Sequence, residues 1–425
     1  MKHIVFVESN ANGLSALTTA KELGYYVTFI RSTHFEHYYI HDNMFAKAMA
    51  SVDAYIELND ITDELALGAT LSSVHASRPV DALITVLEHI ILPLARAARR
   101  VGIPFTSAEA VELARDKGAM RRRLDEMGVP SVRFVTGADP NHLIEQADKI
   151  GYPLIFKPTS GLSSWFIKRV DSRGDLEVAF DEYRRELGEM NEIYNTIMND
   201  TVVIEEYLEG TMISLEICAS RGVTTPLSIC ERKRYSKNEI LELGSTMPAT
   251  LPPDQWEAVC QYGQSVLEAM GLDMGIFHLE IILTTRGPLL IEANPRLIGG
   301  MGPRLLSLTL GRNIYGLLID AHLGNPVLPP DSAPRCYATS RVMALEEESI
   351  YYREELSPWH EEYHSSLVYY RFGLKQGDKV PKAASNEHSF GYFVVQANSP
   401  WESEHLAEAI LGRLREELQL PLIIH

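Results

Sequence analysis

Two neighbouring apolar segments near the middle of the chain carry acidic side chains in positions that predict a cation site. The segments cover 275–283 and 288–296, and a turn containing Gly and Pro separates them, which predicts a β-hairpin. If the turn centres on Arg286, Glu280 lies opposite Glu292. Opposed side chains sit about 4.5–5.5 Å apart, and like charges there are destabilising. A chain that pairs two carboxylates in an apolar hairpin therefore needs a cation to offset them.

The same register predicts which side chains would bind that cation. His278 falls opposite Asn294, and residues two apart on a strand share a face. Carboxylate and amide oxygens without sulfur suit Mg²⁺, which usually binds one or two carboxylates together with substrate phosphates. The predicted metal ligands are Glu280, Glu292 and Asn294. Arg296 follows directly, and its planar guanidinium matches a phosphate or a carboxylate.

A simpler interpretation of this hairpin is also open. The acids of an ordinary hairpin face solvent and bind nothing. The assumed register matters as well, because a slip of one residue would turn the polar side chains of one strand to the other face. The metal site is therefore a hypothesis that depends on the register.

The bulk properties of the chain exclude several classes of protein. A length of 425 residues suggests about two or three domains with a real hydrophobic core. The formal net charge of −18 argues against nucleic acid as the main partner. The 4 cysteines are far apart in sequence and form neither a zinc motif nor a disulfide framework, so we expect a reducing cytoplasm. We find no signal-peptide pattern and no apolar stretch long enough to span a membrane.

The N-terminal part alternates strands and helices, which predicts a doubly wound parallel sheet. The strands are expected at 4–7, 27–30 and 82–86, and the helices at 14–23 and 94–99. In such sheets, ligands bind at the carboxyl ends of the strands. The loop 9–13 and the segment 85–89 would lie there, which makes His89 a candidate pocket residue. The loop lacks a GxGxxG motif, so a dinucleotide is weakly supported.

The remaining chain predicts lysines and acids on further helices and strands. Lys117 opens a helix at 118–127, and Lys157 lies near the end of a strand at 152–158, directly before a Ser/Gly loop. Further strands are expected at 202–208 and 391–396, and further helices at 175–190, 254–270 and 400–418. The Pro-rich stretch 326–334 looks like a boundary.

Taken in order, these segments resemble the ATP-grasp superfamily. The resemblance rests on Lys117, Lys157, the Ser/Gly loop, the segment 205–210, Glu280 and the Glu-x-Asn-x-Arg run at 292–296. It covers nearly the whole chain, and it is most similar to carboxylate–amine ligases that join amino acids, the L-amino acid ligases or dipeptide synthetases. The implied α/β fold has an N-terminal open parallel-sheet domain at 1–112 and an ATP-grasp domain at 113–330. A small lid at about 135–208 and a C-terminal subdomain at 331–425 that completes the grasp body are also implied.

The resemblance also implies which residues bind the nucleotide. ATP and Mg²⁺ are the expected cofactors, with two magnesium ions and with Mn²⁺ as a substitute. The implied ATP contacts are Lys117, Lys157, Ser160, Gly161, Ser163, Ser164, Glu205, Glu206, Tyr207, Leu208 and Glu216. Lysines act as point charges on phosphates, and backbone N–H groups of a loop can cradle them. The plain alternatives are solvated surface lysines, an ordinary turn with few glycines, and an ordinary strand end.

On the substrate side, the resemblance implies Arg296 and Lys157 as catalytic residues. Arg296 would hold the carboxylate and then the acyl phosphate. The implied substrate-binding residues are Arg296, Gly299, Gly300, His89 and Ser245. Relatives often carry a histidine where Ser245 stands, so no acid–base role is expected there. Gly300 leaves room in the pocket, which predicts a less restricted substrate range. The run 231–234 is either a solvated face or part of a substrate-side loop.

The activity implied by the resemblance is that of an ATP-dependent ligase of EC 6.3 type. ATP phosphorylates the carboxylate of one amino acid, and the amine of a second amino acid or short peptide attacks the acyl phosphate. Alternatives are an ATP-grasp ligase acting on formate or bicarbonate and a purine-precursor amine, a non-catalytic nucleotide-binding module, and a Rossmann-type oxidoreductase. Neither a nucleic acid nor a membrane is an expected partner. A homodimer is the default assembly.

Overall fold

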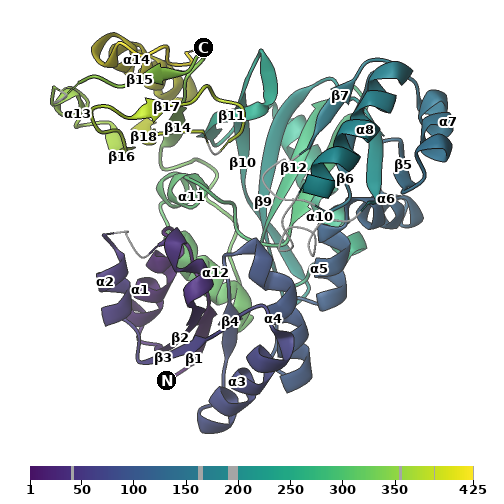
Figure 1. The fold of residues 1–425 in the computed structure, drawn as a ribbon. Helices are drawn as coiled ribbons and strands as arrows, with labels where there is room; N and C mark the ends of the chain where they lie inside the picture. Colours follow the sequence, from purple (N-terminus) through teal and green to yellow (C-terminus); the bar gives the residue numbers. More distant parts are fainter. Residues whose placement is uncertain (40–42, 161–165, 190–199, 354–356, 387, 425) are drawn as a thin grey trace.

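The protein is organised around an 8-stranded antiparallel sheet, and smaller α/β bodies flank it (Figure 1). The computed structural model describes residues 1–39, 43–160, 166–189, 200–353, 357–386 and 388–424. Gly161, Ser163 and Ser164, which are predicted phosphate contacts, lie outside these ranges. None of the helices within the described ranges is both long enough and apolar enough to cross a membrane.

The N-terminal body is a parallel sheet with strand order β3-β2-β1-β4. Strand β1 is buried along its whole length and β2 is buried beyond its first residue, because both consist largely of apolar and β-branched residues. The strands are β1 (His3–Val7), β2 (Tyr26–Ser32), β3 (Ala54–Leu58) and β4 (Ala82–Ile84). The helices are α1 (Leu14–Glu22), the 3-10 helix η1 (Thr33–Tyr38), α2 (Phe45–Ala50), α3 (Glu64–Ser77), α4 (Glu88–Val101) and α5 (Ala108–Arg115). The doubly wound sheet expected for this part is confirmed.

The central sheet has the strand order β13-β12-β9-β10-β11-β14-β18-β16, with antiparallel neighbours. Its first five strands in chain order are β9 (Thr211–Ser220), β10 (Val223–Tyr235), β11 (Asn238–Met247), β12 (Gly275–Thr284) and β13 (Gly287–Asn294). The associated helices are α6 (Lys117–Glu126), α10 (Pro253–Met270), α11 (Gly302–Leu310) and α12 (Ile314–Leu323). Helix α12 packs against α1 and β4 of the N-terminal body, so that body also uses a helix from far along the chain.

The alternation of apolar and polar side chains along the central strands determines which face of the sheet carries the candidate site residues. Leu215 on β9 and Leu279 on β12 are fully buried and belong to the same hydrophobic cluster as Val259 and Val266 of α10. Their neighbours along each strand, such as Ser214 and Glu280, point to the opposite face because successive side chains of a strand alternate. One face is therefore the core under α10, and the other is free to line a site.

A second, smaller sheet forms the body at the right of Figure 1, with strand order β5-β8-β6-β7. Its strands are β5 (Phe134–Gly137), β6 (Leu154–Pro158), β7 (Lys168–Val170) and β8 (Val202–Glu206), and its helices are α7 (Pro140–Ile150) and α8 (Arg173–Glu189). Phe156 of β6 packs edge-on against Phe180 of α8, which joins the helix to the sheet. This body carries Lys157 on β6 towards the central sheet.

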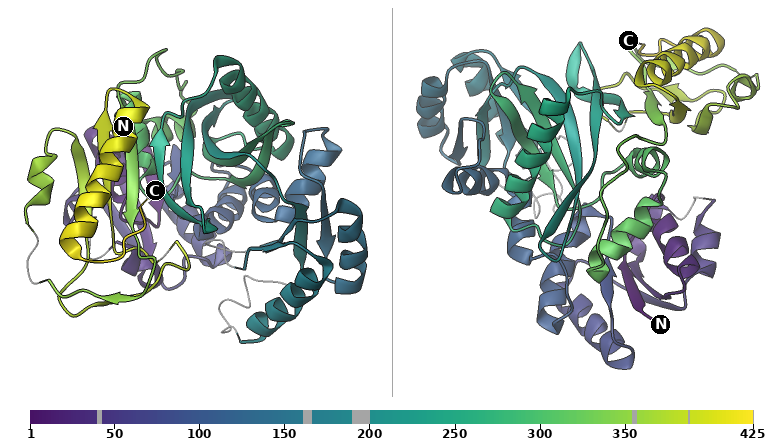
Figure 2. Two further views of the ribbon diagram at one scale, coloured as in Figure 1. Left: turned by 90° about the horizontal axis from the view of Figure 1, so that it is seen from above. Right: turned by 180° about the vertical axis from the view of Figure 1, so that it is seen from behind.

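The C-terminal segment continues the central sheet and then covers it, as the yellow end of the chain shows in Figure 2. Its elements are β14 (Tyr337–Met343), β15 (Ser349–Ile350), α13 (Trp359–Glu362), β16 (Leu367–Phe372), β17 (Lys379–Val380), β18 (Gly391–Ala397) and α14 (Pro400–Leu418). Ser399 caps α14 because its side chain accepts a hydrogen bond from the N–H of Glu402. The helix expected at 400–418 is confirmed.

The hairpin that carries the predicted metal ligands has the expected register. Glu280 pairs with Glu292, and His278 pairs with Asn294, between β12 and β13. The turn is closed by Thr284, whose hydroxyl accepts from the N–H of Arg286 at 3.0 Å. The register on which the cation site depends is therefore confirmed.

Candidate active site

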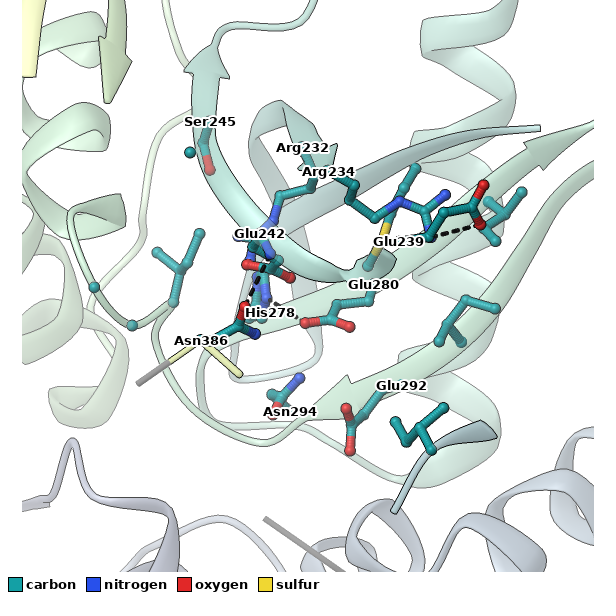
Figure 3. Close-up of a pocket in the computed structure, with 18 of the residues that line it drawn as sticks. Arg232, Arg234, Glu239, Glu242, Ser245, His278, Glu280, Glu292, Asn294 and Asn386 are labelled. Atoms are coloured by element: carbon teal, nitrogen blue, oxygen red, sulfur yellow. Dashed lines mark hydrogen bonds and ion pairs between the residues drawn. The ribbon is translucent and has the colours of Figure 1, made fainter. Parts of the chain in front are cut away.

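A cavity of about 1150 Å³ lies between the central sheet and the bodies that flank it, and Figure 3 shows part of its wall. Each body contributes to it. The N-terminal body gives Asn12 and Glu88, the small sheet gives Lys157 and Glu205, the central hairpin gives His278, Glu280, Glu292 and Asn294, and the C-terminal strands give Ser340 and Arg341. A site assembled from all parts of the chain is typical of a cleft that binds more than one substrate.

The carboxylates of the hairpin are held by cationic neighbours. Nε2 of His278 lies 3.3 Å from Oε1 of Glu280, and Nζ of Lys117 lies 2.6 Å from Oε1 of Glu292. Burial opposes ionisation of Glu280, but the His278 imidazole more than offsets it and lowers the pKa of this carboxyl. Nη2 of Arg296 donates to Oδ1 of Asn294 at 3.3 Å. The three predicted metal ligands thus lie together with cations around them.

His278 is fixed from behind by Glu216. Nδ1 of His278 lies 2.6 Å from Oε1 of Glu216, a side chain that is fully buried. Burial lowers the pKa of His278, but the carboxylates of Glu216 and Glu280 outweigh it and raise this pKa. Glu216 does not belong to the described cavity wall. The structure therefore places Glu216 behind His278, whose imidazole its carboxylate contacts, and the nucleotide contact expected for Glu216 stays a prediction.

The two predicted lysines both line the cavity and are both buried. Nζ of Lys157 pairs with Oε2 of Glu205 at 2.7 Å, and Nε of Arg121 pairs with Oε1 of the same carboxylate at 2.7 Å. Burial lowers the pKa of Lys157, while burial and the Glu292 carboxylate act in opposite directions on Lys117 and leave its pKa raised. The side chain of Glu205 therefore anchors Lys157.

Local sequence explains how Lys117 reaches this position. The side chain of Asp116 caps α6 by accepting from the N–H of Ala119 at 2.8 Å. Lys117 is then the first residue of the helix, and its N–H donates to the carbonyl of Thr159 at 2.9 Å. This bond ties the helix start to the residues after Lys157, so both lysines approach the same end of the cavity.

Several apolar side chains also line the cavity. Its lining includes Ile155, Ile167, Leu208, Met212, Ile282 and Ile291. Leu208, a predicted ATP contact, is also buried. The N–H groups of Glu206 and Tyr207 already donate to the carbonyls of Arg133 and Pro153 at 3.0 and 3.1 Å. Contacts from these two residues to a base would thus come from their carbonyl oxygens.

Arg296 lies beside an acid that sequence reasoning missed. Its Nη2 donates to Oε2 of Glu88 at 2.7 Å, and both side chains line the cavity. Burial opposes ionisation of Glu88, but the Arg296 guanidinium holds the pKa of this carboxyl below its ordinary value. The neighbouring His89 instead stacks on Phe35, with ring centroids 6.3 Å apart, and is not part of the described cavity wall. The structure therefore places Glu88, rather than His89, in the described cavity wall, and the role expected for His89 stays a prediction.

The start of helix α4 explains why Glu88 rather than His89 lines the cavity. The sequence predicted a helix at 94–99, whereas α4 begins at Glu88. Neighbouring residues on a helix point in directions about 100° apart, so only one of Glu88 and His89 can face the cleft. An acid in the first turn of a helix is also stabilised by the helix dipole, and this signal favours Glu88.

The remaining predicted residues divide into three groups. Ser245, Gly299 and Gly300 line the cavity. Ser160 is half-buried and is not among the described lining residues. Arg232 lines the cavity as well, and it belongs to the run 231–234 that the sequence left open as a solvated face or part of a substrate-side loop. Side chains of a strand alternate between its two faces, and this alternation is the signal that could have indicated an inward-facing Arg232.

Comparisons with known proteins agree with this geometry. Residues 150–303 match the ATP-grasp domain family, and residues 17–105 match the ATP-grasp N-terminal domain family. The crystal structure of L-amino acid ligase from Bacillus licheniformis superposes with a TM-score of 0.77 over 100% of this chain and 99% of that chain, at 21% identity. The chain belongs to the ATP-grasp superfamily. At this level of identity, the superposition establishes the ATP-grasp fold.

Curated relatives align with this chain over only part of their length. Alanine–anticapsin ligase of Bacillus subtilis (strain 168) is 28% identical over 257 residues, which cover 56% of this chain and 53% of that protein. Dapdiamide A synthase of Enterobacter agglomerans is 23% identical over 336 residues, which cover 75% of this chain and 73% of that protein. The chain thus spans about half the length of the first of these relatives.

The residues present fit the ATP and Mg²⁺ that ATP-grasp enzymes use. Two carboxylates and one amide oxygen form a donor set suited to Mg²⁺, and the bonds from Lys117 and His278 each use only one oxygen of a carboxylate. Within the described ranges, no three His, Cys, Asp or Glu side chains gather into a metal-binding group. The expected set contains only two acids, so phosphate oxygens would complete it.

Gly300 provides a test of pocket size in this ATP-grasp site. A Cβ at Gly300 would meet no atom within 4 Å, although its φ of 56° is unfavourable for other residues. We expect Gly300→Trp to reduce kcat/KM for amino acids with large side chains by about tenfold relative to small ones, because an added ring fills open space. A mismatch of pocket size of this order costs about 1–3 kcal/mol.

The control for this change is Gly300→Ala, which carries the backbone strain without the bulk. Comparing kcat/KM across a series from glycine to phenylalanine measures the effect. The same substrate preference in Gly300→Trp as in Gly300→Ala would remove Gly300 from the pocket.

Proposed function

We propose that the protein is an ATP-dependent carboxylate–amine ligase that joins two amino acids. The Arg296–Glu88 pair carries this proposal, because its two charges match the two charges of an α-amino acid. The carboxylate of the substrate would bind to Arg296, and its ammonium group would bind to Glu88. A formate or bicarbonate ion has no ammonium group for Glu88 to bind. The relative named alanine–anticapsin ligase, whose name states that it joins alanine to another compound, supports the same choice.

The reaction follows from the order of charges along the cavity. Lys117 and Lys157 would bind the ATP phosphates, and Glu280, Glu292 and Asn294 would hold Mg²⁺, which when bound would offset the phosphate charge. A carboxylate oxygen of the first amino acid, held by Arg296, attacks the γ-phosphorus, and the bond to the β-phosphate oxygen breaks to give ADP. The neutral amine of the second amino acid then attacks the acyl carbon. Phosphate leaves with its oxygen, and the amide nitrogen loses a proton.

The chain itself contributes mainly positioning and charge. Arg296 keeps the carboxylate in line, and Asn294 and Glu88 fix Arg296 in turn. We also propose the division into an N-terminal domain at 1–112, an ATP-grasp domain at 113–330 with a lid at about 135–208, and a C-terminal subdomain at 331–425. The separate small sheet that carries Lys157 supports a lid, because its strands pair only with one another within the described residues.

The test is incubation with ATP, Mg²⁺ and a mixed pool of amino acids, followed by mass spectrometry. We expect new dipeptide masses together with ADP. ADP without any amide would move the acceptor outside the amino acids. No ADP with any pool would contradict the proposal.

The metal assignment can be tested separately with Glu292→Gln. We expect the Mg²⁺ concentration at half-maximal ADP formation to rise and the rate to fall by about 10- to 100-fold, because a neutral amide offsets less of the cation charge. Glu257→Gln on the exposed side of α10 is the matched control. Full ADP formation by Glu292→Gln with an unchanged Mg²⁺ requirement would show the metal assignment to be wrong.

A further inference from the structure

Arg232 is a second guanidinium on the chemical face of the central sheet. Glu280 pairs with Ser214 on β9, and Ser214 pairs with Cys230 on β10. Paired residues share a face, and so do residues two apart on one strand, so Arg232 lies on the same face as Glu280. Its own partner on β11 is Ser245. Arg232 therefore faces the cavity from the side of Glu280 opposite to β13 and Arg296.

The side chain of Arg232 is mostly buried, and only part of its hydrogen-bonding capacity is satisfied. It is 11% exposed, and it forms an ion pair with Glu242 (Figure 3). Its Nε is buried and has no hydrogen-bond partner within the described part of the chain. An unpaired buried donor costs about 1–3 kcal/mol, so its persistence in the cavity wall points to a partner supplied by a ligand. Glu242 is itself held, because its N–H donates to Oδ1 of Asn386 at 2.9 Å.

Two arginines on opposite sides of Glu280 match the needs of two carboxylate substrates. Both guanidinium groups lower the pKa of Glu280. Arg296 already has a role with the carboxylate that becomes phosphorylated. The carboxylate of the second amino acid must also enter this cavity, where the phosphates repel it. It therefore needs a cation that does not already bind ATP.

We infer that Arg232 binds the α-carboxylate of the amino acid that supplies the amine. This inference rests on the proposed ligase function and narrows it, because the acceptor must then carry a free carboxylate next to its amine. Glu242 holds the guanidinium in place. The N–H at Nε donates a hydrogen bond to a carboxylate oxygen of the amino acid that supplies the amine. Simple amines and α-amides of amino acids become poor acceptors.

The experiment compares an acceptor amino acid, its α-amide and hydroxylamine in the unmodified protein and in Arg232→Ala. Hydroxylamine traps an acyl phosphate as a hydroxamate and has no carboxylate. We expect the unmodified protein to prefer the amino acid over its amide by about 10- to 100-fold in kcat/KM. In Arg232→Ala this preference should disappear through a higher KM for the amino acid, while hydroxamate formation from the first substrate stays within about twofold.

Two further variants separate binding from folding. Arg232→Lys keeps the charge but loses Nε and the planar fork, so we expect it to restore only part of the preference. Lys233→Ala removes the neighbouring cation on the same strand, which is not among the described lining residues, and should leave the preference unchanged. If Arg232→Ala does not fold, the preference of the unmodified protein and of Arg232→Lys still decides the question.

Three outcomes would overturn the inference. Equal use of amino acid and amide by the unmodified protein would show that no carboxylate is recognised. Parallel loss of hydroxamate and dipeptide in Arg232→Ala would assign Arg232 to phosphoryl transfer instead. Absence of hydroxamate with every amino acid in the unmodified protein would contradict the proposed function itself, and the inference with it.

Discussion

Replacing Arg296 with alanine is expected to reduce the rate of acyl phosphate formation by about 10²–10³-fold, the usual loss when one preorganised donor to a developing charge is removed. The guanidinium lies between Glu88 and Asn294, at 2.7 and 3.3 Å, so it is already oriented before a substrate arrives. Without it, the substrate carboxylate would face Glu280, Glu292 and the phosphates with no cation of its own. Hydroxamate formation with hydroxylamine measures this step directly.

Arg296→Lys should recover little of the lost rate. An ammonium group is a point charge, whereas the reaction needs a planar group that holds Glu88 and a carboxylate at the same time. Arg173→Ala is the matched control, because Arg173 is exposed and pairs only with acids of the small-sheet body in the described structure. A loss of less than about fivefold in Arg296→Ala would contradict the role of this residue in phosphorylation.

The hairpin shows what could be predicted from the sequence. Polar residues at every second position near the site end of each strand and a Gly-containing turn predicted the pairing of Glu280 with Glu292, although the register also shifts between Glu280 and Ile281. The lysines were found for a related reason, since a charged residue in an apolar strand or at a capped helix start is unusual enough to notice.

The residues that were missed all depend on contacts between distant parts of the chain. Glu88 meets Arg296 across 208 positions of sequence, and Arg121 meets Glu205 across 84. No local pattern specifies such pairs. Arg232 was hidden differently, because a run of charges resembles a solvated surface until the neighbouring strands show which of its residues face inward.

Replacing Glu205 with glutamine is expected to lower the free energy of unfolding of the surrounding domain by about 3–5 kcal/mol, the typical effect of breaking a buried ion pair. Glu205 offsets two cations at once, Arg121 and Lys157, and all three side chains are at most 4% exposed. The variant leaves two positive charges facing each other without water. The same change should lower the pKa of Lys157 further and weaken ATP binding, because Glu205 is the carboxylate that raises it.

The pH dependence of this loss identifies its cause. Burial alone would raise the pKa of Glu205, but Arg121 and Lys157 outweigh it and bring the pKa to about 2, below its ordinary value of 4.5. An acid with a lowered pKa stabilises the folded state fully above its unfolded pKa and loses that contribution as the pH falls towards the folded value. The stability gap between the unmodified protein and Glu205→Gln should therefore be constant above about pH 5 and shrink below pH 4.5.

Urea unfolding at pH 7 and at pH 4 measures both the gap and its change. Glu177→Gln is the control, because Glu177 is exposed and forms an i,i+4 pair with Arg173 at 3.2 Å, for which we expect less than about 0.5 kcal/mol. If the gap for Glu205→Gln stayed the same at both pH values, the loss would come from packing. The buried charges around Lys157 would then not be what keeps this lysine in place for phosphate.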